Sequence, residues 1–210
     1  MNPDSNRKGP PVETQGWRGA GSFDSLVDMA ETKRIIRIGL VSDTHVPVSL
    51  PSLPDPLLDS LAGVDLILHA GDLVSPDVLD RLNGIAPTRA VFGNMDPPEV
   101  RQKLNRQEMI EIAGRSIGLK HGDQRHDLQR RYISLDYDAP EFELFYQAMA
   151  TQLPEAEIIV FGHFHRPLVR EWKGITFINP GAVAPSHGRS TFAVLELGDR
   201  VDVRIVEIDL

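Results

Sequence analysis

Two histidines separated by one residue, His163 and His165, are well placed to bind a metal ion. They follow an apolar run at residues 158–161, which is typical of a buried strand, and Pro167 ends the segment. In an extended strand, residues i and i+2 point the same way, whereas irregular backbone after Gly162 would aim the two imidazoles at different atoms. In either case two neutral nitrogen ligands reach one place, which suits a transition metal. A His-x-His pair alone is a weak signal.

Four further polar motifs stand directly after apolar, strand-like runs of the chain. Segments that leave the carboxyl ends of neighbouring strands converge on one crevice in open α/β sheets. With the histidine pair, these segments supply two aspartates, one asparagine and four histidines, which is more than one tetrahedral ion uses. Such a set fits two ions that share a bridging carboxylate, ~3.5–4 Å apart in metal-assisted hydrolases. The candidate ligands are Asp43, His45, Asp72, Asn94, His121, His163 and His165.

The order Asp-x-His, Gly-Asp, Gly-Asn, His-Gly, Gly-His-x-His resembles that of the calcineurin-like metallophosphoesterases. The shortness of the chain, the segment Leu68-His69-Ala70-Gly71-Asp72 and the triplet Asn179-Pro180-Gly181 look most like the small YfcE-type phosphodiesterase subgroup. The likeness covers roughly residues 35–208. Each motif alone is only modestly specific, but all of them in this order are very specific.

The resemblance implies a site in which two divalent ions share the ligands. Manganese is the favoured metal, and iron, zinc, nickel, cobalt and magnesium are the alternatives, because mixed nitrogen and oxygen ligation accepts them all. A hydroxide between the ions would be the nucleophile, and Asp72, Asn94 and His121 would act in catalysis through it. The implied ligands are Asp43, His45 and His165 for the first ion and Asn94, His121 and His163 for the second, with Asp72 bridging both.

The activity that the resemblance implies is metal-dependent hydrolysis of phosphodiesters. Met95 stands where many larger members of the superfamily have a histidine that helps to protonate the leaving group. Because a methionine cannot transfer a proton, we expect a preference for diesters with good leaving groups over unactivated monoesters. A series of aryl esters with graded leaving-group pKa tests this hypothesis.

Two other functional classes are weighed against the phosphodiesterase. The first is a non-catalytic scaffold or interaction protein, since a eukaryotic retromer subunit shares this fold with a degraded metal site; here no ligand is replaced. The second is a nuclease, which the net charge of −8 and the lack of a basic, aromatic surface stretch disfavour. A small, nucleotide-like diester is therefore the expected substrate, and a homo-oligomer remains open.

Composition limits the remaining possibilities. The chain has no cysteine, so thiolate ligands, disulfides and a cysteine nucleophile are excluded. No apolar run approaches the ~20 residues that a membrane helix needs, and the N-terminus lacks the apolar stretch of a signal peptide. We expect a cytoplasmic protein that binds no membrane.

Several other polar residues have a structural interpretation. His69 lies inside an apolar strand, which favours a satisfied core histidine, or a partner of a ligand, over a direct ligand. Asp123 stands where relatives often have a second histidine and begins a polar stretch, 123–138, that we expect to be a solvated loop and helix face. The alternative is a lid whose arginines meet phosphate. The residues concerned are Arg125, Arg130 and Arg131, while His126 is expected in a solvated loop and His187 outside the site.

The elements that must position these residues alternate between strands and helices. Strands are predicted at 35–41, 64–70 and 88–92, and helices at 56–61, from Ser75-Pro76 and from Pro97-Pro98. The second half predicts strands at 108–112, 116–120, 157–161, 168–172, 174–178, 191–197 and 201–208, and a helix at 139–153.

This pattern indicates a parallel βαβ half followed by a mainly antiparallel half. We therefore predict an α/β (α+β) fold, a two-sheet mixed β-sandwich flanked by helices, in one domain over residues 34–210. Residues 1–33 lack periodicity and are expected to be a disordered N-terminal extension, with a translation start at Met29 as an alternative.

Overall fold

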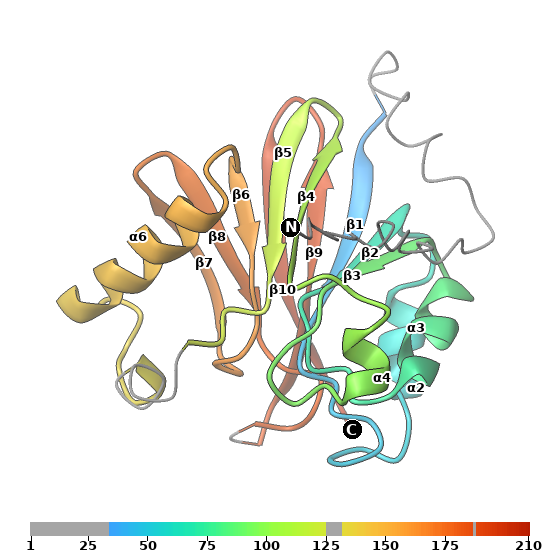
Figure 1. The fold of residues 1–210 in the computed structure, drawn as a ribbon. Helices are drawn as coiled ribbons and strands as arrows, with labels where there is room; N and C mark the ends of the chain where they lie inside the picture. The colour runs from blue at the N-terminus through green and yellow to red at the C-terminus, as the bar shows by residue number, and fades with distance from the viewer. Residues whose placement is uncertain (1–33, 125–131, 187) are drawn as a thin grey trace, which may run out of the picture.

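The computed structural model describes residues 34–124, 132–186 and 188–210. Two five-stranded sheets face each other, and helices cover their outer faces (Figure 1). This is the helix-flanked sandwich of two mixed sheets that the sequence predicts. The expected N-terminal extension lies outside the described residues. Within the described part of the chain, no helix is long and apolar enough to cross a membrane.

The first sheet has the strand order β10-β9-β1-β2-β3. Its parallel strands alternate with helices along the chain, as predicted; β9 adds antiparallel to β1, and β10 adds antiparallel to β9 at the edge. The elements are β1 (Ile36–Val41), α2 (Asp55–Ser60), β2 (Leu66–His69), α3 (Pro76–Asn83), β3 (Thr88–Ala90), α4 (Pro98–Arg101), β9 (Ser190–Leu197) and β10 (Val201–Ile208).

Helix α3 shows why these residues take this local structure. Pro76 occupies its first turn, and the Oγ of Ser75 accepts a hydrogen bond from the backbone N–H of Asp77 at 3.2 Å. This cap satisfies one of the N–H groups that a helix start leaves without a partner. The predicted helix start at Ser75-Pro76 is therefore confirmed.

The second sheet has the order β4-β5-β6-β8-β7, with parallel pairing in its centre and antiparallel pairing at both edges. Together with the antiparallel pairings of β9 and β10 in the first sheet, this agrees with the mainly antiparallel second half that the sequence indicates, although β6 pairs parallel to both of its neighbours. The helical segment between β5 and β6 carries the chain back to the same end of the sheet, so that β6 must run parallel to β5. The elements are β4 (Gln107–Ile112), β5 (Arg115–Lys120), η2 (Pro140–Phe142), α6 (Glu143–Gln152), β6 (Ile158–Val160), β7 (Pro167–Trp172) and β8 (Ile175–Pro180).

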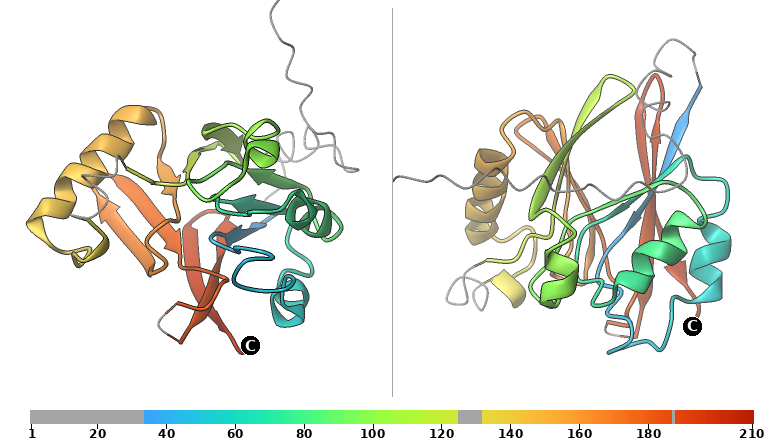
Figure 2. Two further views of the ribbon diagram at one scale, coloured as in Figure 1. Left: turned by 60° about the horizontal axis from the view of Figure 1, so that its bottom comes forward. Right: turned by 45° about the vertical axis from the view of Figure 1, so that its right-hand side comes forward.

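Three hydrophobic clusters of described residues hold these layers together. The first lies between the sheets and joins side chains of both, such as Ile38, Leu68, Ile117 and Val160. The second packs α2 and α3 on the outer face of the first sheet. The third lies between α6 and the second sheet, so that helices occupy opposite outer faces (Figure 2). Its aromatic members, here called the aromatic cluster, are Tyr132, Tyr137, Phe142, Phe145, Tyr146, Phe161, Phe164, Trp172 and Phe177.

Candidate metal centre

The loops that follow the parallel strands meet at one end of the two sheets (Figure 1). Backbone hydrogen bonds join them: the N–H of Asp43 donates to the carbonyl of Gly71 at 3.0 Å, and the N–H of His45 donates to that of Asp72 at 3.1 Å. Because these bonds link the ends of adjacent strands, the polar residues after β1 and β2 stand side by side. The convergence expected of parallel strand ends is thus present.

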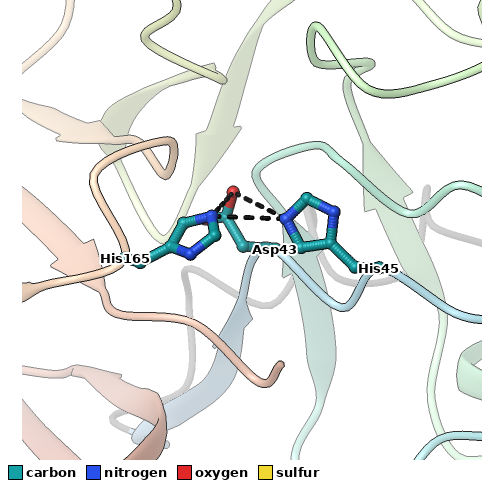
Figure 3. Close-up of side chains that lie close together, drawn as sticks. All are labelled: Asp43, His45 and His165. Atoms are coloured by element: carbon teal, nitrogen blue, oxygen red, sulfur yellow. Dashed lines mark hydrogen bonds and ion pairs between the residues drawn. The ribbon is translucent and has the colours of Figure 1, made fainter. Parts of the chain in front are cut away.

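Asp43, His45 and His165 form the first group of candidate ligands. Figure 3 shows the two imidazoles on either side of the Asp43 carboxylate. The Nε2 of His165 lies 3.2 Å from Oδ1 of Asp43 and 3.2 Å from Nε2 of His45. Two neutral ring nitrogens at this distance compete for a single proton. A cation among the three side chains would use the lone pairs of both rings, so the group fits a bound metal.

The second group surrounds His121 and contains Asp43 and Asp72. The Nε2 of His121 lies 3.2 Å from Oδ2 of Asp72 and 3.2 Å from Oδ1 of Asn94. Its Nδ1 lies 2.8 Å from the carbonyl of Ala70, which accepts a hydrogen bond from a protonated Nδ1. A proton held at Nδ1 leaves the lone pair of Nε2 free to bind a metal.

His163 points its Nε2 into the protein, where this buried nitrogen has no hydrogen-bond partner. Its ring lies edge-on to that of His121, with 5.2 Å between the centroids. A buried nitrogen without a partner is costly, so this atom fits a ligand position. His163 and His165 have φ angles of 71° and 55°, so the backbone is irregular and the imidazoles face different partners. Of the two geometries weighed from the sequence, the irregular one is present.

The two groups share a carboxylate. Among the described residues, Asp43 belongs to both. Asp72, to which the resemblance gives the bridging role, also reaches both sides, because its Oδ2 lies 3.2 Å from Nε2 of His121 and 3.9 Å from Nε2 of His45. The assignment of each ligand to one ion stays a prediction.

Burial and charge shift the titration of these groups in opposite directions. Burial disfavours the charged form of Asp43, but the hydrogen bond from His165 and the charge of His121 outweigh it and hold its pKa below the usual range. Burial also opposes protonation of His121, yet the hydrogen bond with Asp72 raises the pKa of its imidazole to about 9. Burial dominates at His163 and lowers its pKa to about 4. Without metal, His121 is therefore charged at neutral pH and His163 is neutral.

Asp96 is a site residue that the sequence analysis missed. Its buried carboxylate accepts hydrogen bonds from the backbone N–H groups of Asp72 at 2.9 Å, Gly93 at 2.8 Å and Val74 at 2.7 Å. It thereby ties the loop after β2 to the loop after β3. Its position directly before Pro97, two residues after Asn94, is an Asp-Pro turn signal that could have drawn attention to it.

Two more polar side chains fix the ligand loops. Arg101 of α4 donates from Nε to the carbonyl of Asp96 at 2.6 Å and from Nη2 to the carbonyl of Asn94 at 2.7 Å. The buried amide of Asn179 donates to the carbonyl of Gly162 at 2.8 Å, directly before His163. Both side chains position ligand-bearing backbone without facing the centre themselves.

Gly93 must be a glycine because the loops approach so closely. A Cβ there would lie 2.6 Å from Cδ2 of His121 and closer still to Oδ1 of Asp72. Real Cβ atoms do not tolerate such distances, so any side chain would push the candidate ligands apart.

Of the remaining candidates from the sequence, two lie among the described residues and the others lie outside them. His69 is buried, accepts a hydrogen bond from the N–H of Gly71 at 3.2 Å and lies 3.3 Å from Oγ1 of Thr44, so it is a satisfied core histidine. Asp123 accepts a hydrogen bond from Arg106 at 2.9 Å. The hypotheses on Arg125, His126, Arg130, Arg131 and His187 concern positions outside the described residues.

Known proteins resemble this chain in sequence and in fold. The family model of the calcineurin-like phosphoesterase superfamily domain matches residues 36–200. A probable metallophosphoesterase of Methanothermobacter thermautotrophicus is 34% identical over 80% of this chain and 91% of its own length. A phosphodiesterase of Methanocaldococcus jannaschii is 24% identical over 70% of this chain and 83% of its own. Among solved structures, wild-type Vps29 of Entamoeba histolytica complexed with Zn²⁺ is 25% identical, with a TM-score of 0.62 over 82% of this chain and 99% of its own.

Proposed function

From the premise that the chain belongs to the calcineurin-like phosphoesterase superfamily, we propose that it is a dinuclear metal-dependent phosphodiesterase. The observation that carries the proposal is the pair of adjoining ligand groups that meet at Asp43. The unpartnered Nε2 of His163 beside them supports it, because it supplies a further nitrogen ligand to the same centre. One group alone would serve a single ion, whereas two adjoining groups suit a pair.

We assign the ligands as the resemblance implies, with Asp72 between the two positions. When bound, two divalent ions would supply an activated water and neutralise charge on the phosphoryl oxygens. The protein contributes the placement of the ligands and the tautomer of His121, which Ala70 fixes through its carbonyl. Manganese remains the favoured metal. The first position takes Asp43, His45 and His165, and the second takes Asn94, His121 and His163.

Met95 bears on the choice of substrate. Its side chain is 52% exposed, and its backbone N–H donates to Oδ1 of Asp72 at 2.7 Å, which places the residue beside the centre. A thioether has no proton to give, so the leaving group departs from this position without acid assistance. We propose small phosphodiesters with good leaving groups as substrates. Nucleotide-like diesters suit a cytoplasmic protein with net charge −8 better than long nucleic acids do.

A non-catalytic interaction protein is the second candidate. The likeness to Vps29 of Entamoeba histolytica, at 25% identity and a TM-score of 0.62, favours it. The two candidates differ in turnover and not in metal binding, since a metal alone can serve to stabilise a loop. Activity measurements are therefore needed beside metal analysis.

The deciding experiment measures metal content and turnover in the same samples. Protein stripped with a chelator and reloaded with Mn²⁺ is expected to hold two ions per chain and to hydrolyse bis(p-nitrophenyl) phosphate. Asp72→Ala should lower turnover by about 100-fold or more, because it removes a ligand that reaches both groups. Asp80→Ala is the matched control, since Asp80 lies exposed on α3. Metal binding without turnover would favour the interaction protein, and a wild type that binds no metal would refute the dinuclear centre.

A further inference from the structure

The loop that carries His163 and His165 is anchored by the residue between them. Phe164 is 7% exposed and packs in the aromatic cluster, and its ring also lies edge-on to that of His163, with 5.2 Å between the centroids. Its ring centroid lies 5.1 Å from that of Phe145 and 5.3 Å from that of Phe142, with edge-on geometry in both pairs. Such pairs stabilise beyond the area that they bury, and they fix the direction of each ring. The backbone that carries the two histidines is therefore anchored by a buried ring.

Tyr137 fastens the same loop one residue further on. Its hydroxyl donates to the backbone carbonyl of Arg166 at 2.7 Å, directly after His165. The guanidinium of Arg166 lies 4.8 Å from the centre of the Tyr137 ring and donates to the carbonyl of Leu135. Two hydrogen bonds thus join the loop and the segment before α6, one donated from each of them.

The backbone of this loop needs such an anchor. His163 and His165 both have positive φ angles, in a region that residues with a Cβ rarely adopt. Conformations of this kind persist only where the surroundings over-determine them. Within the loop, the N–H of Phe164 donates to the carbonyl of Gly162 at 2.8 Å. The N–H of His163 donates to Oδ2 of Asp43 at 3.0 Å, and the contacts of Phe164 and Tyr137 add further restraint.

We propose that Phe164 and Tyr137 are positioning residues, through which the aromatic cluster sets the placement of His163 and His165 and hence the affinity for metal. The proposal about affinity rests on the proposed metal centre, whereas the proposal about placement concerns the protein itself. Neither side chain touches the reacting atoms. Both act on the ligands through the backbone, and Phe164 acts also through the contact of its ring with that of His163.

Placement is tested first in the metal-free protein, by amide hydrogen exchange of residues 162–166. Phe164→Leu should speed exchange there by about 10-fold or more, because the loop loses its fixed ring contacts. Phe177→Leu is the matched control: Phe177 is fully buried in the same cluster, and its ring contacts are with Tyr146, Phe161 and Trp172. Equal exchange at residues 162–166 in the two variants would overturn the proposal that Phe164 places the loop, since any cavity in the cluster would then have the same effect.

Affinity is tested by titration with Co²⁺, whose visible absorption reports the geometry of its ligands. Tyr137→Phe keeps the ring and removes only the hydroxyl. It should weaken the binding of one of the two Co²⁺ ions by about 10-fold and change the visible absorption of that ion. Tyr146→Phe is the control, because it removes the hydroxyl that donates to the carbonyl of Tyr137 at 3.3 Å and leaves the loop untouched.

Wild-type affinity and spectrum in Tyr137→Phe would overturn the affinity part of the proposal. Failure of the wild-type protein to bind Co²⁺ would refute the metal centre instead. The exchange comparison, made without metal, would still decide whether Phe164 places the loop.

Discussion

The ligand-bearing loops on the two sides of the candidate metal centre are held in place by different interactions. On the side of β1 to β3, the loops are fixed by a buried carboxylate, Asp96, and by backbone hydrogen bonds between loops. On the side of β6, an aromatic ring, Phe164, buried in a cluster of other rings, adds to the hydrogen bonds that Asn179 and Tyr137 donate to the loop. Hydrogen bonds fix direction atom by atom, whereas ring packing fixes volume and shape. We therefore expect the loops of the first side to lose their ligand geometry when one polar atom is lost or displaced. The loop of the second side should keep its geometry after substitutions that conserve the volume of the side chain.

Gly93→Ala should have the largest effect, because it breaks the polar side by steric means. The added Cβ would meet His121 at 2.6 Å, and Asp72 more closely, so both ligands must move. We expect the free energy of unfolding to fall by about 3 kcal/mol and metal binding to be lost. Urea denaturation and metal analysis measure the two effects.

Gly84→Ala is the control for that substitution. Its Cβ would face only backbone carbonyls, the nearest being that of Arg81 at 3.2 Å, at the end of α3 and far from the ligands in sequence. Stability and metal content should stay close to wild type. Retention of metal by Gly93→Ala would show that the loops of the polar side can shift to admit a Cβ and still hold the ligands in place.

Asp96→Asn should have the next largest effect. The amide has one acceptor oxygen where the carboxylate has two, so at least one of three buried N–H groups loses its partner. A loss of about 2 kcal/mol is expected in denaturant unfolding of the metal-free protein. On the aromatic side, Phe164→Met, which nearly conserves volume, should cost about 1 kcal/mol. Equal costs for the two variants would erase the difference between the sides.

The protonation of the two inward-facing histidines should sharpen the comparison. In the metal-free protein, His121 is expected to titrate with a pKa of about 9 and His163 with a pKa of about 4. The proton on His121 stabilises the fold below pH 6.5, and this stability is lost as pH rises through 9. Neutral His163 stabilises the fold above pH 6.5, and this stability is lost as pH falls through 4.

Proton NMR of the imidazole Cε1–H signals, assigned with His121→Gln and His163→Gln, measures both values. Two titrations near the ordinary value of 6.5 would mean that neither the contact of His121 with Asp72 nor the burial of His163 sets the charge of these rings. Metal affinity should rise with pH up to about 9, because a metal must displace the proton of His121.

Arg101→Lys should have the smallest effect. The lysine keeps the charge but cannot donate at once to the carbonyls of Asp96 and Asn94 as the guanidinium does. Because Arg101 is exposed, we expect a loss of only about 0.5 kcal/mol in stability and a slight weakening of metal binding. Isothermal titration with Mn²⁺ is the measurement, and Arg81→Lys on α3 is the control. A loss of metal as complete as in Gly93→Ala would contradict this order.

Local patterns were enough to predict most elements of the fold. The cap at Ser75 and the apolar runs at β1 and β2 depend on neighbouring residues, which a sequence displays directly. The direction of β6 and the return of β9 to the first sheet depend on partners far along the chain. No short-range pattern encodes them, and so the sequence did not indicate the parallel pairing of β6 or the sheet to which β9 belongs.

The site divides in the same way. The candidate ligands could be predicted because each follows a strand end, where their side-chain chemistry stands out. The roles of Asp96 and Phe164 could not, because an aspartate in a turn and a phenylalanine after a strand are ordinary in any sequence. Only their partners distinguish them: the N–H groups of two different loops for Asp96, and the rings of α6 and η2 for Phe164.

The pairing of β1 with β9 has a consequence for the order of events during synthesis. Ile36 pairs with Leu197, and the N–H of Ala184 donates to the carbonyl of Asp43 at 3.0 Å. A ribosome releases the first of these partners long before the last, and so distant a contact forms slowly. The nascent chain must therefore keep Asp43 without its final neighbours until almost the whole domain has emerged. Competence to bind metal should then appear as one of the last steps of folding.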